Sequence, residues 1–111
     1  MNVTVRIDDL IDELQRVSQR YQASVSVTRD GQFLSICLIP SEPIVSFINP
    51  SLSREFRLEC LSVDEDTFTT TLHRLNAILR DIREHLEKID EVTRKLRLKL
   101  RGLVEKEDES E

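Results

Sequence analysis

The chain has 111 residues, 39% of them hydrophobic and 33% charged, and a formal net charge of −5. This length suits a single domain with a core of its own and without disulfide or metal staples. The negative balance argues against general affinity for nucleic acid, which needs an excess of cations. No apolar run approaches the roughly 18 residues of a membrane span, and the start, MNVTVRID, lacks the features of a signal peptide. We therefore expect a cytoplasmic protein that makes no membrane contact.

The first residues predict a strand followed by a helix. Residues 2–7, NVTVRI, alternate between apolar and polar side chains and contain β-branched residues, which is typical of a strand. Asp8 can then cap a helix. A rival interpretation starts this helix near Thr4. The apolar residues that follow Asp8 trace one helical face, and they are Leu10, Ile11, Leu14, Val17 and Tyr21.

Residues 23–39 predict a β-hairpin. Asp30 and Gly31 favour a two-residue loop, because Asp-Gly tolerates positive φ angles. That loop pairs Val27 with Leu34, Val25 with Ile36, and Ala23 with Leu38. One face of the hairpin is then apolar, and the other carries Ser24, Ser26, Thr28, Phe33, Ser35 and Cys37.

Three prolines bracket the next segment, residues 40–53, which also holds Ile44, Val45, Phe47, Ile48 and Leu52. Prolines exclude a central strand there. A short edge strand, a docking surface and a lid over the core all remain open, and the lid is favoured. Residues 55–61 alternate again and predict a strand with Phe56, Leu58 and Cys60 facing inward. We interpret Cys37 and Cys60 as small buried side chains, because they form no CxxC pair.

A long helix is expected at about 64–102. Asp64 suits its N-cap, with Val63 and Phe68 at the staple positions, and Gly102 suits the residue after its end. The acidic residues 105–111 are expected to be a disordered tail. The fold class is therefore α+β, in a single domain over residues 1–104. It has a small antiparallel sheet of three or four strands, one short helix and the long C-terminal helix.

The long helix follows a heptad pattern that is apolar except at Thr93, with Leu72, Leu79, Leu86, Thr93 and Leu100 at a and Phe68, Leu75, Ile82, Ile89, Leu96 and Leu103 at d. About 38 helical residues span roughly 57 Å, whereas strands of eight residues cover only ~26 Å. Part of this apolar face would extend beyond the sheet. We therefore expect a homodimer or hetero-oligomer through this helix, or else a monomer whose helix folds back near 89–92. The residues expected at the interface are Leu72, Leu75, Leu79, Ile82, Leu86, Ile89 and Leu96.

A basic stretch near the end of the helix carries Arg94, Lys95, Arg97, Lys99 and Arg101 without an intervening acid. Such a stretch can contact nucleic acid or an acidic partner. Alternatively, cations at this position complement the negative end of the helix dipole. The dipole interpretation is favoured.

The sequence offers little for catalysis. It contains no glycine-rich phosphate loop and no recognisable serine, histidine and aspartate arrangement. His73 and His85 lie twelve residues apart on the helix, so they cannot share a metal, and each is interpreted as a surface residue. We expect a protein that is not an enzyme and that has no cofactor or metal.

Asp64, Glu65 and Asp66 precede the long helix, and Asn76 lies between apolar residues near its third turn. With the predicted order of strand, helix, hairpin, strand and long helix, this resembles the small dimerising (Pcc-type) subunit of the KEOPS complex, which makes threonylcarbamoyladenosine in tRNA. The resemblance implies a non-catalytic subunit that bridges a catalytic partner and helps to hold tRNA. The segment 40–53 and the helix beyond Ile89 depart from that family. A small acidic inhibitor and an RNA-associated regulatory protein remain alternatives.

Overall fold

The computed structural model describes the backbone of residues 1–109 and the side chains of residues 1–103. Its elements in chain order are β1 (Asn2–Arg6), α1 (Ile7–Arg20), β2 (Ala23–Asp30), β3 (Phe33–Pro40), α2 (Pro43–Ile48), the 3-10 turn η1 (Pro50–Leu52), β4 (Arg54–Glu59), β5 (Leu61–Ser62), β6 (Thr67–Thr71) and α3 (Leu72–Glu109). The predicted α+β class is confirmed. The strands divide between two antiparallel sheets, β2-β3-β4 and β1-β6-β5, rather than forming one.

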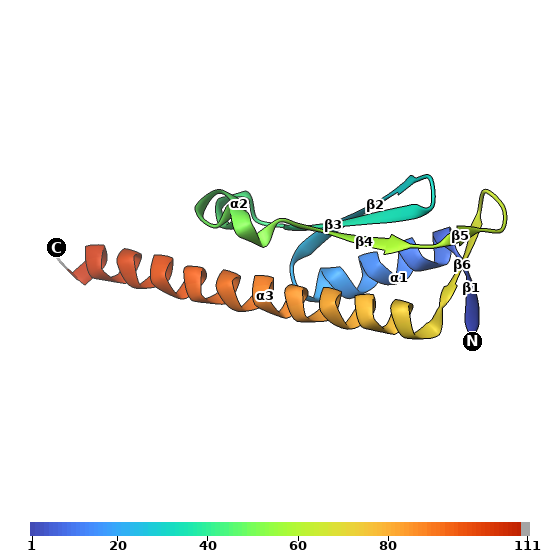
Figure 1. The fold of residues 1–111 in the computed structure, drawn as a ribbon. Coiled ribbons are helices and arrows are strands. Elements are labelled where there is room, and N and C mark those ends of the chain that lie inside the picture. Colours follow the sequence, from blue (N-terminus) through green and yellow to red (C-terminus); the bar gives the residue numbers. More distant parts are fainter. Residues whose placement is uncertain (110–111) are drawn as a thin grey trace.

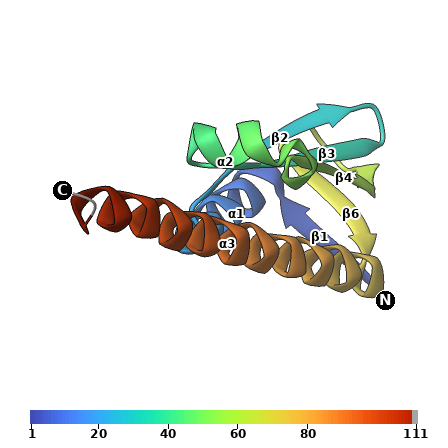
Figure 2. The ribbon, with the colours of Figure 1, turned by 90° about the vertical axis from the view of Figure 1, so that its left-hand side faces the viewer.

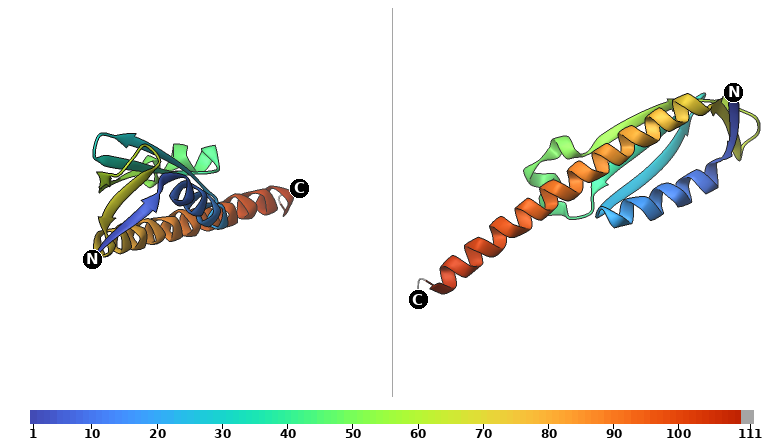
Figure 3. Two further views of the ribbon diagram at one scale, coloured as in Figure 1. Left: turned by 90° about the vertical axis from the view of Figure 1, so that its right-hand side faces the viewer. Right: turned by 90° about the horizontal axis from the view of Figure 1, so that it is seen from below.

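Helices α1 and α3 cover one face of the β2-β3-β4 sheet, and α2 lies beside the later part of α3 (Figures 1 and 2). The core forms between these layers, from apolar side chains of α1, β3, β4 and α3. The molecule measures 66 × 22 × 20 Å. It is this long because α3 continues past the rest of the chain as a single helix (Figure 3).

Strand β1 and helix α1 lie where the alternation and the helical periodicity predicted them. Leu10 and Leu14 are buried, as expected for the apolar face of α1. The helix begins at Ile7, however, and no side chain caps it. Asp8 is therefore a first-turn acid that interacts with the positive end of the helix dipole, rather than the N-cap.

Strands β2 and β3 form the predicted hairpin, but their register differs from the prediction by two residues. The observed pairs are Val27 with Ile36, Val25 with Leu38, and Ala23 with Pro40. The loop is Gly31–Gln32, in which only Gly31 has a positive φ, +59°. A type II′ turn needs this angle at its first loop residue alone, whereas an Asp-Gly type I′ loop needs it at both. A shift of two residues preserves the faces, so Leu34, Ile36 and Leu38 are buried as predicted.

The long helix begins at Leu72 rather than at Asp64, which corrects the sequence prediction. Residues 67–71 form β6 and pair with β1, and Phe68 is fully buried on that strand. Asp64 closes a turn instead: its Oδ1 accepts hydrogen bonds from the amides of Asp66 and Thr67 and from the Thr67 hydroxyl, each at 2.9 Å. The following run of threonines favours extended backbone, because β-branched residues fit strands better than helices.

The end of the long helix also differs from the prediction. Its backbone is helical through Gly102 as far as Glu109, without a fold-back near 89–92. Gly102 does not have the positive φ of a helix-terminating glycine. A glycine inside a helix costs about 1 kcal/mol relative to alanine, which does not by itself end a long helix. The tail expected at residues 105–111 lies outside the residues whose side chains are described.

Candidate protein-interaction surface

The middle of the apolar face of α3 belongs to the core of the chain itself. Four of the seven predicted interface residues, Leu75, Ile82, Leu86 and Ile89, are only 0–8% exposed. Leu79 and Leu96 are half-buried, and Leu72 is exposed. The four buried side chains already contact their own sheet and helices, so they are core residues rather than accessible partner contacts. A heptad pattern shows that one helix face is buried, but it does not show what buries it.

Two polar residues on this face help to fix the position of the helix. Thr93 is buried, and its hydroxyl donates to the Ile89 carbonyl at 2.7 Å. His85, expected at the surface, is buried as well. Its Nε2 lies 2.6 Å from the Leu52 carbonyl oxygen, and its ring packs edge-on against Phe56. The hydrogen bond of His85 ties η1 to α3.

The segment between the prolines forms α2 and η1 and covers one end of the core. Val45 and Leu52 point inward and are almost fully buried, which agrees with the favoured lid. Arg97 of α3 pairs with Glu42 at the start of α2 and also donates to the Gln22 side chain. These contacts hold α2 against α3.

The outer face of α2 is apolar and exposed. Ile44, Phe47 and Ile48 stand at i, i+3 and i+4, which places them on one side of a helix. Phe47 is 85% exposed. Pro43 occupies the first turn, where a missing N–H costs nothing, and this starts the helix just past the end of β3. The inner side of the segment is therefore the favoured lid, and its outer side is apolar and exposed, as the alternative of a docking surface requires.

A groove of about 240 Å³ separates α2 from α3, with Ile48 and Leu96 among its apolar lining and Lys95 and Lys99 beside them. Past this groove the apolar face of α3 continues without cover, because Leu100 is 40% exposed and Leu103 is 59% exposed. We call the combined feature the α2–α3 surface. It consists of Ile44, Phe47, Ile48, Leu96, Leu100 and Leu103.

Sequence reasoning identified only Leu96 of these six as an interface residue. Leu100 and Leu103 were present in the heptad pattern, but the expected interface stopped before them. The available signal was distance: these two residues lie farthest along the helix from the predicted sheet. Ile44, Phe47 and Ile48 lay in the segment whose role was left open.

The basic stretch at the end of α3 is partly neutralised by acids of the same chain. Arg94 pairs with Asp90 at 2.8 Å, and Lys95 pairs with Glu91 at 2.9 Å. Arg97 pairs with Glu42, as noted above. Within residues 1–103, Lys99 and Arg101 form no ion pair. This pairing lowers the positive charge that a nucleic-acid backbone would meet.

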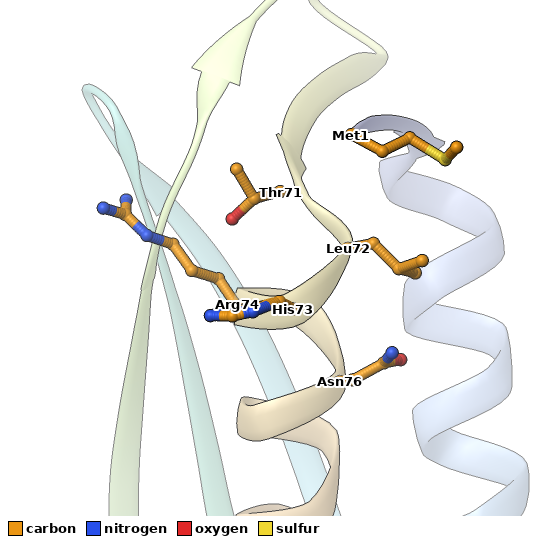
Figure 4. A pocket seen from close by; sticks show the side chains of 6 residues that line it. All are labelled: Met1, Thr71, Leu72, His73, Arg74 and Asn76. Atoms are coloured by element: carbon orange, nitrogen blue, oxygen red, sulfur yellow. The ribbon is translucent and has the colours of Figure 1, made fainter.

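A second hollow, of about 560 Å³, lies at the start of α3. Figure 4 shows that its side chains diverge: Thr71 and Arg74 extend towards the strands, whereas Met1, Leu72 and Asn76 lie on the side of the neighbouring helix. Catalysis requires groups that converge on one reacting atom. This hollow therefore lacks the geometry of an active site.

The two cysteines are free thiols, Cys37 half-buried and Cys60 buried. Burial raises the pKa of the Cys60 thiol above its usual value of 9.0, against a smaller opposing effect of Arg29.

Among the side chains that the structure describes, no three histidine, cysteine or acidic groups are close enough to hold a metal ion. The same part of the chain contains no helix that is sufficiently long and apolar to cross a membrane. Comparison of the chain with known protein families, curated proteins and solved structures gives no match.

Proposed function

We propose that this chain is a non-catalytic assembly subunit of a multiprotein complex, and that it docks through the α2–α3 surface. The supporting observation is the exposure of five large apolar side chains on α2 and the end of α3, next to half-buried Leu96, on a body whose own core is already filled. Large exposed apolar patches mark interaction sites on soluble proteins. The protruding end of α3 gives a partner access to one whole side of the helix.

The lining of the surface indicates the chemistry of its partner. An apolar groove between two helices accepts the apolar face of another helix. Lys95 and Lys99 line this groove, and they favour a partner whose polar flank is acidic. The partner can be a second copy, giving a homodimer, or a different chain, giving a hetero-oligomer.

The particular complex that we propose is a KEOPS-type, cytoplasmic complex that makes threonylcarbamoyladenosine in tRNA. The proposal is supported by β1, α1, the β2–β3 hairpin, β4 and α3, which follow one another in the expected order, with α2, η1, β5 and β6 between them. Strand β6 before the long helix is a further difference from the pattern expected for that family, besides the segment 40–53 and the helix beyond Ile89.

A second candidate function is association with RNA through the end of α3. It is supported by Arg94, Arg97 and Arg101, which line a shallow hollow together with Leu98. RNA binding through this site predicts an affinity that falls steeply with salt, because bound cations release counterions from the phosphates. Replacing Arg94 and Arg101 by glutamate, which keeps the contact of Arg97 with Glu42, is then expected to abolish the RNA binding.

The assembly function is tested by the native mass of the tagged full chain in an extract of its host cell. A docked subunit migrates far above the 12.9 kDa of one chain. Phe47→Asp and Leu100→Asp place a charge on the docking surface and are expected to return the chain to low mass.

The matched control for this experiment is Leu98→Asp. Leu98 is 65% exposed and lies two residues from Leu100, so it points away from the α2–α3 surface. It is expected to leave the high-mass species unchanged. Equal behaviour of all three variants and the wild type would show that this surface does not dock.

A further inference from the structure

We propose that a hollow between the end of β6 and the start of α3 binds a small oxyanion, through a phosphate or carboxylate group. The hollow has a volume of about 230 Å³. It lies at the end of the molecule away from the α2–α3 surface (Figure 1), so the inference goes beyond the proposed assembly function. Its lining includes Asn2, Glu59, Thr70, Thr71 and Arg74.

The start of α3 lacks the negative charge that usually stabilises the N-terminus of a helix. Helix α1 carries Asp8 and Asp9 in its first turn, whereas the first turn of α3 contains no acidic residue. It contains Arg74 instead, and a cation interacts unfavourably with the positive end of the helix dipole. A bound anion reverses the sign of this interaction.

The residue before α3 does not cap the helix. A capping threonine at Thr71 would accept a hydrogen bond from the amide of the second or third helical residue, here His73 or Arg74. The Oγ1 of Thr71 is buried, however, and has no hydrogen-bond partner among the described side chains and backbone. The amides of His73 and Arg74 therefore lack the side-chain acceptor that a cap supplies, and such amides are a common binding site for oxyanions.

A second buried hydroxyl beside the helix start supports the same ligand. Thr70 is only 5% exposed, and its Oγ1 has no partner either. Within the described part of the chain, the hydroxyls of Thr70 and Thr71 are the only buried side-chain groups without a hydrogen bond. Burying an unpaired hydroxyl is unfavourable, and valine would fill the same space without this cost. An oxyanion in the hollow supplies the missing acceptors.

Arg74 supplies the positive charge of the site. Figure 4 shows that its side chain and that of Thr71 extend to the same side of the helix start, towards the strands. Its Nη1 lies 3.5 Å from the Glu59 carboxylate, and the two side chains are 59% and 56% exposed, so this ion pair is weak. Arg74 can therefore turn to an anion in the hollow. Glu59 repels that anion and lowers its affinity.

The volume and the donors define the class of ligand. About 230 Å³ is less than the roughly 300–1,000 Å³ of pockets for drug-sized molecules, so the ligand is small. Hydroxyls, helix N-terminal amides and a guanidinium are the donors that bind phosphate and carboxylate oxygens. Both groups match this set of donors, and a titration with each distinguishes them.

An NMR titration of the purified full chain tests this inference. Inorganic phosphate and acetate are the ligands, and chloride at equal ionic strength and pH is the reference. We expect the amide signals of His73 and Arg74 to shift and to saturate with an oxyanion, but not with chloride. Saturation by phosphate alone identifies a phosphate ligand, saturation by acetate alone identifies a carboxylate, and saturation by both shows that the site accepts either group.

Four variants test the roles of individual residues. Arg74→Gln is expected to weaken binding at least about tenfold, because it removes a charge-assisted hydrogen bond. Thr70→Val is expected to weaken binding without lowering the Tm in anion-free buffer, since the lost hydroxyl has no partner in the protein. Glu59→Gln removes the repelling charge and is expected to strengthen binding. Arg80→Gln is the matched control, because it makes the same charge change at an exposed position of α3 outside the hollow.

Several results would overturn the oxyanion site. These are equal shifts in chloride and in both oxyanions, unchanged binding by Arg74→Gln, or an equal loss of binding in Arg74→Gln and Arg80→Gln. A lower Tm for Thr70→Val in anion-free buffer would show that this hydroxyl has a partner within the protein, which also contradicts the site. The mass of the tagged chain in extract does not depend on these results, so the assembly function is tested separately.

Discussion

Replacing Ile89 by alanine separates the two roles that the apolar face of α3 could play. Ile89 is completely buried between α3 and the body, whereas Leu100, on the same face, is 40% exposed. Removing a fully buried isoleucine side chain costs about 2–5 kcal/mol, through lost burial and the cavity left behind. A whole domain of this size is stable by only about 5–15 kcal/mol, so the loss is large. Leu100→Ala removes a partly exposed side chain, and we expect it to cost the monomer less than about 1 kcal/mol.

Urea unfolding followed by circular dichroism measures both changes in the free energy of unfolding. The measurements need several protein concentrations, because self-association would add stability to the native state. At the lowest concentration we expect a large loss for Ile89→Ala and a small loss for Leu100→Ala. If Ile89→Ala costs under about 0.5 kcal/mol, the middle of the α3 seam is not part of the core, and the interface expected from the heptad pattern would be restored.

Three further predictions concern individual side chains. His85→Leu leaves the carbonyl of η1 without its buried partner and should cost about 1–3 kcal/mol; in urea unfolding, equal losses for it and for exposed His73→Leu would contradict this role. Hydrogen bonds from the turn lower the pKa of Asp64 below 3.8, so its contribution to stability is present above the unfolded pKa and disappears as the pH falls through the lower folded pKa. If the Asp64 carboxyl titrates by NMR with a midpoint at or above 3.8, the turn does not stabilise its charged form. Burial raises the pKa of Cys60, so an alkylating reagent should modify Cys37 first; faster reaction of Cys60 would exclude its burial.

Local patterns predicted the type of each element in residues 2–39, because alternation and helical spacing each correspond to one kind of element. The alternation in residues 2–7 and the apolar spacing from Leu10 to Val17 produced the expected strand and helix. The faces of the hairpin were also predictable, since they depend only on odd and even positions. Its register was not, because Asp30 and Gly31 allow two loop positions that differ by one residue. The positive φ of Gly31 alone selects between them.

The start of the long helix could not be read from the sequence, because Asp64 can cap either a helix or a turn. The competing signal was the threonine run 69–71, whose β-branched side chains favour a strand. Pairing of this strand with β1 then moved the helix start to Leu72. Tertiary pairing, rather than local preference, decided the boundary.

The interaction surface was predictable in kind but not in its residues. The length argument predicted that α3 either extends beyond the body or folds back near 89–92, and the structure shows that it extends (Figure 3). The heptad pattern is equally apolar at Leu86, which is buried, and at Leu100, which is exposed. Only the position of the sheet and of α2 separates core from surface along this face.

Site-specific photo-crosslinking of the full chain in its host cell tests the docking surface most directly. A photoreactive amino acid at Leu100 reports contacts on the α2–α3 surface, and the same group at Leu98 reports the opposite side of the helix two residues away. We expect a discrete adduct from position 100 and none from position 98. An adduct at twice 12.9 kDa identifies the second copy, and any other discrete mass identifies a different partner. Equal labelling at the two positions, or no adduct at position 100, would contradict docking through this surface.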